Sequence, residues 1–95
     1  MERFEVRTDA DGVAVAEGEL DLDSLVAVRA GLADPSITTI DLAGVTFIDS
    51  SVIGALLDAH RERQRAGGLC LQDPSDPVLR VLHVSGVDQW MPIKR

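Results

Sequence analysis

The sequence predicts an α/β fold: a mixed, mostly parallel sheet of four to five strands that starts with a β-hairpin and is flanked by about three helices. Two observations lead to this class. The spacing of the apolar residues alternates along the chain between two, as in strands, and about 3.6, as in helices. Apolar residues make up 45% of the chain but aromatic residues only 3%, so the core must be aliphatic. A chain of this length is expected to form a single domain, residues 1–95.

The predicted hairpin occupies the start of the chain. Apolar and charged residues alternate from Phe4 to Arg7, and Val13 and Val15 continue the pattern. Asp11 and Gly12 between them tolerate the positive φ angles of a tight turn.

A first helix is predicted after Leu20, where Leu22, Leu25, Val26 and Leu32 recur at helical spacing. Three side chains are able to cap its N-terminus, namely Asp21, Asp23 and Ser24. Asp34 and Pro35 are expected to end it.

The next strand, residues 38 to 42, is expected to end in a turn at Ala43 and Gly44. The longest helix then carries an apolar stripe of Val52, Ile53, Leu56 and Leu57 and stops at two glycines, residues 67 and 68. Gly54 inside this helix costs ~1 kcal/mol relative to alanine, which predicts a close approach to the sheet. Three arginines near the C-terminal end suit the helix dipole: Arg61, Arg63 and Arg65.

The last third of the chain is expected to add a strand at residues 69 to 71, a helix from about Ser75 to Gly86, and a strand at residues 91 to 93. Pro92 lacks an amide hydrogen and therefore confines the last strand to a sheet edge. Strands joined through single helices run parallel, which makes the sheet mixed.

The charge of the chain limits its partners. Sixteen acidic residues against nine basic ones give a net charge of −7, so nucleic acid is expected to be repelled. No apolar run approaches the ~20 residues of a membrane-spanning helix, so we expect a cytoplasmic protein without direct membrane contact. Cys70, the only cysteine, is expected to be a buried, inert thiol.

The stretch from Asp49 to Ser51 joins a predicted strand to the longest helix, and such turns often carry the site of an α/β domain. A serine nucleophile needs a base within reach, but His60 lies nine residues, or ~13 Å, beyond Ser51 along the same helix. His83 belongs to the opposite edge of the sheet, and the GxSxG pattern is absent. No metal-ligand spacing or phosphate-binding loop is present either, so we expect neither an enzyme nor a metal ion or cofactor.

Two interpretations of the serine pair remain open from the residues alone. Asp and Ser are preferred N-caps, so the stretch could serve the helix only. The unpaired amides and positive dipole end of a helix N-terminus also stabilise an anion, so a phosphate on a first-turn serine could switch binding to a partner.

Three segments resemble the STAS-domain anti-sigma factor antagonist family: "GELD" at 18 to 21, "IDLAGVTFIDSSVIGALL" at 40 to 57, and "VSGVDQWMPI" at 84 to 93. The resemblance implies a bacterial partner-switching protein. Its unphosphorylated form binds an anti-sigma factor that is also a serine kinase, and so releases the sigma factor. Phosphorylation ends this binding, and a serine phosphatase restores it.

Carried over by position, the resemblance makes Ser51 the phosphorylated residue, with Ser50 the second choice. Partner contacts are expected at Asp49, Ser50, Ser51 and Val52, and in the neighbouring loop at Gly18, Glu19 and Asp21. The family usually has glycine where this chain has Val52, whose branched side chain is expected to crowd the Ser51 hydroxyl.

An alternative role remains: a STAS accessory subunit of another assembly, such as a lipid-transport ATPase complex or a stress-signalling scaffold, that is not phosphorylated. The expected state of the protein is a monomer or weak dimer.

Overall fold

The computed structural model of the protein describes residues 3–6 and 12–95. Its sheet has five strands in the order β1-β2-β3-β4-β5. The strands are β1 (Arg3–Val6), β2 (Val13–Leu20), β3 (Thr39–Ile48), β4 (Cys70–Gln72) and β5 (Ile93–Lys94). β1 pairs antiparallel with β2, and the other neighbours pair in parallel. The predicted mixed sheet is confirmed. Of the two residues at which a hairpin turn is expected, Gly12 has a positive φ of 63°, as predicted, while Asp11 lies outside the described residues.

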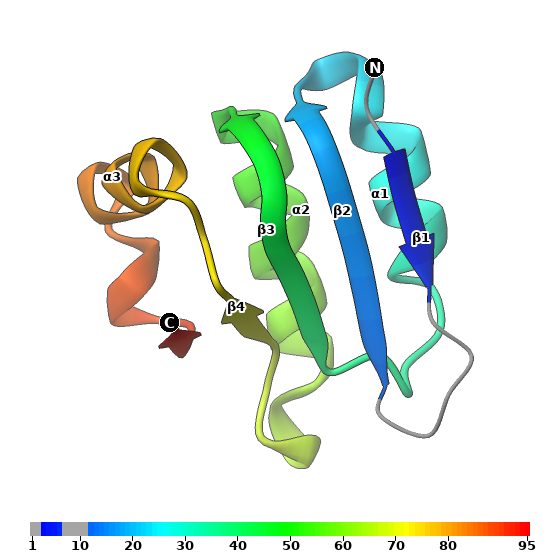
Figure 1. Ribbon diagram of the computed structural model, residues 1–95. Helices are drawn as coiled ribbons and strands as arrows, with labels where there is room; N and C mark the ends of the chain where they lie inside the picture. Colours follow the sequence, from blue (N-terminus) through cyan, green and yellow to red (C-terminus); the bar gives the residue numbers. More distant parts are fainter. Residues whose placement is uncertain (1–2, 7–11) are drawn as a thin grey trace.

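Three α-helices connect or follow the parallel strands: α1 (Leu25–Gly31), α2 (Ser50–Glu62) and α3 (Asp76–Ser85). Short 3-10 helices precede or extend them: η1 (Leu22–Ser24), η2 (Gln64–Ala66) and η3 (Val87–Gln89). α1 and α2 lie side by side behind the sheet in Figure 1, and α3 lies beside β3 and β4. The predicted order of elements is therefore confirmed, including β5 at the edge.

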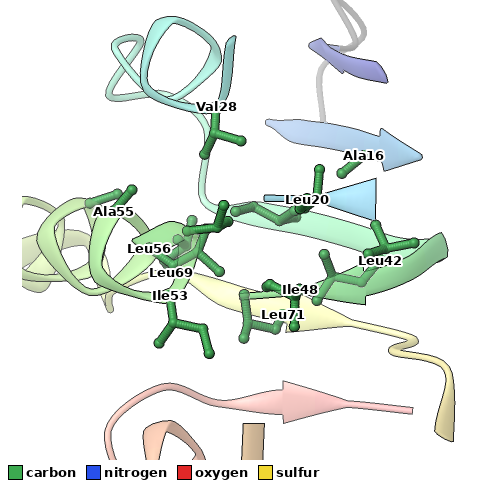
Figure 2. Packing of buried hydrophobic residues seen from close by; sticks show 14 of the residues in the cluster. Ala16, Leu20, Val28, Leu42, Ile48, Ile53, Ala55, Leu56, Leu69 and Leu71 are labelled. Carbon is green, nitrogen blue, oxygen red and sulfur yellow. The ribbon is translucent and has the colours of Figure 1, made fainter. Parts of the chain in front are cut away.

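The core is aliphatic, as predicted, and lies between the sheet and the helices (Figure 2). Ile40 and Leu42 of β3 are buried at alternate positions, and beyond the bulge the buried residues of this strand are Val45 and Ile48. Val28 of α1 and Leu56 of α2 belong to the same buried cluster. The aromatic side chains that the structure describes, Phe47 and Trp90, are 46% and 69% exposed and so contribute little to this core.

The turn predicted at Ala43 and Gly44 is wrong, because β3 runs through both residues. Opposite them, β2 advances by two residues, from Val15 to Glu17, while β3 advances by three, from Asp41 to Gly44. This mismatch is a β-bulge, in which one extra residue bends the strand without ending it. A Cβ at Gly44 would lie 3.1 Å from Cγ of Glu17, a tight cross-strand contact that glycine avoids.

The close approach predicted at Gly54 is also wrong. No atom of another element lies within 4 Å of where a Cβ would stand on this residue.

Substitution Gly54→Ala is expected to stabilise the domain by about 0.5 to 1 kcal/mol, because alanine has the better helix propensity and meets no neighbour. Urea denaturation followed by circular dichroism measures the change. Gly44→Ala is the matched control, since its methyl group would press on Glu17, and we expect no stabilisation there. Loss of stability in Gly54→Ala would contradict the open position of this residue.

Arg63 was expected to complement the dipole of α2 from the surface, but the structure buries this residue, which is only 4% exposed. Its guanidinium donates to four backbone carbonyls: Ala59 at 3.0 Å, Leu32 at 2.6 Å, Asp34 at 2.8 Å and Ile37 at 2.5 Å. Three of these carbonyls belong to the connection between α1 and β3. Arg63 therefore fastens that connection to the C-terminal end of α2.

Candidate functional site

The candidate site lies where β3 ends and α2 begins. Asp49 adopts an extended backbone (φ −110°, ψ 175°) and is the N-cap of α2. Its carboxylate accepts hydrogen bonds from the backbone amides of Ser51 at 3.0 Å and Val52 at 3.2 Å. Two of the otherwise unpaired amides of the helix start are thereby satisfied.

The Ser51 hydroxyl donates to the same carboxylate oxygen of Asp49 at 2.6 Å. This hydrogen bond is the main reason why the pKa of Asp49 lies below its usual value; burial opposes the shift, and amides of Val52, Ser51 and Leu22 add to it. A charge-assisted hydrogen bond of this length holds the hydroxyl in a defined position. Asp49 and Ser51 thus form one hydrogen-bonded unit at the N-terminus of α2.

Because the folded-state pKa of Asp49 is lowered, its contribution to stability is present at neutral pH and is lost as pH falls below about 4. Asp49→Asn retains a capping side chain but cannot titrate. The difference in unfolding free energy between the two proteins is therefore expected to be largest near pH 7 and to shrink toward pH 2. Urea titrations at several pH values measure it, and a constant difference would contradict an ionised cap.

The two serines differ in their surroundings. Ser50 is exposed, and its side chain makes no hydrogen bond within the described part of the chain, whereas Ser51 is partly buried and bound to Asp49. The side chains that support the turn are therefore those of Asp49 and Ser51.

The end of β2 lies directly beside this turn. Glu19 pairs with Phe47 and Leu20 with Ile48, and the Asp49 amide donates to the Leu20 carbonyl at 3.0 Å. The resemblance implied that residues 18 to 21 lie next to the serine loop, and the structure places them there. Gly18 and Glu19, however, belong to strand β2 and not to a loop.

Asp21 begins η1 and shapes this neighbouring segment. Its carboxylate accepts from the amides of Asp23 and Ser24, and the buried Ser24 hydroxyl donates to the Glu19 carbonyl at 3.0 Å. Asp21 is thus occupied as a helix cap, and Glu19 is the more exposed acidic side chain.

Val52 is fully buried and packs in the core. Its side chain therefore faces the core and not the surface that a partner would contact. The expected crowding of the Ser51 hydroxyl stays a prediction. The helix turns by about 100° per residue, so Val52 faces the sheet.

Two exposed apolar residues near the turn were not expected as site residues. Leu22 is 66% exposed and its amide adds to the hydrogen bonding of Asp49, while Phe47 is 46% exposed beside Glu19. Strict alternation from the buried Val45 would place Phe47 on the inner face of the strand. A second register shift, where Gly18 pairs with Val45 and Glu19 with Phe47, turns Phe47 outward, so the sequence pattern alone does not identify it. We call the following set the serine surface: Glu19, Leu22, Phe47, Asp49, Ser50 and Ser51.

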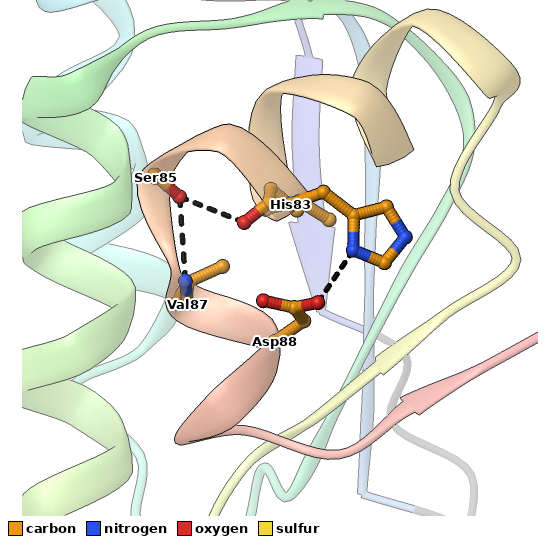
Figure 3. Close-up of polar contacts among 5 residues, drawn as sticks. His83, Ser85, Val87 and Asp88 are labelled. Carbon is orange, nitrogen blue, oxygen red and sulfur yellow. Dashed lines mark hydrogen bonds and ion pairs between the residues drawn. The ribbon is translucent and has the colours of Figure 1, made fainter.

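The histidines are engaged elsewhere. Nδ1 of His60 accepts the Leu69 amide at 2.9 Å, and His83 pairs with Asp88 at 2.5 Å (Figure 3). Within residues 3–6 and 12–95 no group of three His, Cys, Asp or Glu side chains could hold a metal ion. No helix in the same ranges is long and apolar enough to cross a membrane.

The sequence is similar to that of known proteins over most of its length. A family model described as "Mlab, STAS domain" matches residues 4–93. The anti-sigma F factor antagonist of Lysinibacillus sphaericus is 36% identical over 81 residues, which cover 78% of this chain and 69% of the relative.

Solved structures show the same similarity. The anti-sigma factor antagonist SpoIIAA in its unphosphorylated form matches with a TM-score of 0.72 and 29% identity, covering 96% of this chain and 87% of that one. The Bacillus cell fate determinant SpoIIAA in the phosphorylated form matches with a TM-score of 0.65 and 28% identity, covering 96% and 90%. Both structural matches span nearly the whole of this chain.

Proposed function

Because this chain belongs to the STAS domain family, with residues 4–93 matched, we propose that it is an anti-sigma factor antagonist that acts by partner switching. The unphosphorylated protein binds an anti-sigma factor that is also a serine kinase, and so releases the sigma factor. Phosphorylation of Ser51 ends the binding, and a serine phosphatase restores it. The 36% identical antagonist and the two phosphorylation states of SpoIIAA support this role.

One observation in this chain carries the proposal: the Ser51 hydroxyl stands at the N-terminus of α2, hydrogen-bonded to Asp49, on an otherwise open surface. The two flanking apolar side chains, Leu22 and Phe47, offer the desolvated contact that a protein partner needs. Glu19, Asp49 and Asp21 add acidic groups, so the partner should present basic residues at the rim.

The switch follows from charge at this position. A phosphate on Ser51 removes the hydroxyl proton that Asp49 now accepts and adds about −1.5 to −2 charges next to that carboxylate. The phosphate and Asp49 would then compete for the same helix amides. The change is confined to the serine surface, while the core below it is apolar and needs no rearrangement.

In this role the chain is a substrate and a binding module. The kinase holds the ATP, and Ser51 supplies the acceptor oxygen. The single domain of residues 1–95 is proposed to act without a cofactor.

The direct test incubates the protein with ATP and an anti-sigma serine kinase from the same organism, and locates phosphate by mass spectrometry. We expect one phosphate on Ser51, none on Ser51→Ala, and normal modification of Ser50→Ala. Phosphate on Ser50 alone would move the acceptor site, and failure to bind or be modified by any anti-sigma kinase would refute the proposal.

The description of the matched family model favours a second candidate, an accessory STAS subunit of a different assembly that is not phosphorylated. In that case Asp49 and Ser51 only cap α2, and the serine surface binds its partner permanently. Affinity capture with the unmodified protein would recover a transporter ATPase and no anti-sigma factor.

A further inference from the structure

A second concave site lies on the other half of α2. Its volume is about 340 Å³, within the range of small-molecule sites. Its lining comes from the last two turns of α2, from η2, and from η3 with the residue after it: Leu57, His60, Arg61, Gln64, Gln89 and Trp90. From Ser51 to His60 the helix rises by ~13 Å, so this cavity is separate from the serine surface.

Trp90 supplies the apolar part of the cavity. It is 69% exposed, although an indole ring gains more than most side chains from burial. Leu57, partly buried against the core, lines the same cavity. An indole and a leucine at one site offer a flat apolar surface on which a ring could stack.

The polar part of the lining consists of hydrogen-bond donors and neutral amides. Nδ1 of His60 is taken by the Leu69 amide at 2.9 Å, so in the neutral ring Nε2 carries the proton and can donate. The backbone at Gly68 packs against this ring, since a Cβ there would fall 2.3 Å from it, and the ring is thereby held in place.

Among the described residues that line the cavity, Arg61 is the one with a formal charge. Its ion pair with Asp58, at 3.6 Å, is exposed on both sides, and Asp58 does not line the cavity. Because an exposed pair of this kind contributes little, the guanidinium remains available to a second anion. No carboxylate from residues 3–6 or 12–95 lines this cavity, although the chain as a whole is acidic.

From this combination we propose that the cavity binds a small planar carboxylate: an aromatic ring stacked on Trp90 with its carboxylate held by Arg61 and the Nε2 proton of His60. The site is shallow and the chain carries a charge of −7, so the dissociation constant should be on the order of 0.1 to 1 mM. This inference does not depend on the proposed function.

The composition of the chain makes the test specific. Trp90 is the only tryptophan, so ¹⁵N-labelled protein gives a single indole N–H resonance in the cavity. Titration with 2-naphthoate should shift that resonance in a saturable way. The neutral isostere 2-naphthalenemethanol should bind at least fivefold more weakly, because it cannot pair with Arg61.

Variants separate the two halves of the site. Arg61→Gln should weaken naphthoate binding five- to tenfold and leave the alcohol unchanged, and Trp90→Ala should abolish both signals in ligand-observed NMR. Arg65→Gln is the matched control, because Arg65 is exposed nearby in η2 but does not line the cavity. Unchanged resonances, equal binding of the alcohol, or an equal effect of Arg65→Gln would overturn the proposal.

One further outcome would reassign the cavity. If Trp90→Ala folds normally but loses capture of the anti-sigma kinase, the exposed indole belongs to a protein interface, and a small-molecule site is refuted.

Discussion

Replacing Arg63 with methionine is expected to lower the free energy of unfolding by about 3 to 5 kcal/mol. The guanidinium donates to the carbonyls of Leu32, Asp34, Ile37 and Ala59, and methionine fills the volume but donates to none of them. A domain of this size is stable by only about 5 to 14 kcal/mol, so the variant should lie close to the limit of folding. Urea denaturation followed by circular dichroism measures the loss.

Two controls make this prediction specific. Arg63→Lys keeps the charge and some donors but cannot reach four carbonyls at once, so an intermediate loss is expected. Arg65→Met removes an exposed arginine and should change stability by no more than about 0.5 kcal/mol. If the Arg63→Met and Arg65→Met proteins had equal free energies of unfolding, the buried hydrogen bonds of Arg63 would make no net contribution to stability, and the prediction would be wrong.

Phosphorylation of Ser51 is expected to weaken binding of the anti-sigma kinase at least 100-fold. The phosphate places a dianion beside Asp49 and Glu19, so the main change at the serine surface is added negative charge. Like charges placed together at an interface, or charges left unpaired there, cost several kcal/mol of binding free energy. Calorimetric titration of the kinase with phosphorylated and unphosphorylated protein gives the ratio of the dissociation constants.

The matched variants separate charge from loss of the hydroxyl. Ser51→Ala should bind within a few-fold of the original protein, and Ser51→Glu should fall between the original and phosphorylated forms. Ala33→Glu adds a charge in the exposed segment after α1, at the other end of the domain, and should leave affinity unchanged. Equal loss in Ser51→Ala and the phosphorylated protein would mean that the hydroxyl itself is a contact and not a switch.

Local signals in the sequence identified the elements and the cap. Asp49 before a helical apolar stripe predicted a helix start there, which agrees with the structure. The last strand lies at the sheet edge, as predicted, but it begins at Ile93, so Pro92 precedes it instead of lying inside it. These features depend on residues within a few positions of one another, which the sequence shows directly.

Features that depend on distant residues were not predictable in this way. Gly44 is a residue type that is common in turns, but its pairing with β2 keeps it inside a bulged strand. Gly54 in a helix indicated a close neighbour, and none is there. Arg63 has the sequence position of a surface arginine, and only the folded connection between α1 and β3 brings it four carbonyls.

The position of Val52 in the apolar stripe of the helix agrees with the structure, because its side chain is buried. One residue along a helix changes the direction of a side chain by about 100°, so Ser51 points away from the side that Val52 buries. Val52 therefore belongs to the core, and Ser51 stays accessible from the surface.

Arg63 lies ~18 Å along α2 from Ser51, so stability and partner binding depend on separate parts of the helix. This separation affects how the amount of folded protein in the cell can change. A partner switch responds to the ratio of free antagonist to anti-sigma factor, and that ratio depends on how much antagonist survives in the cell as well as on how tightly it binds. Variation around Arg63 would change the amount of folded protein, because marginally stable chains are degraded, while the serine surface would keep its affinity. Evolution could therefore reset the threshold of the switch through abundance alone, without altering the surface that the kinase recognises.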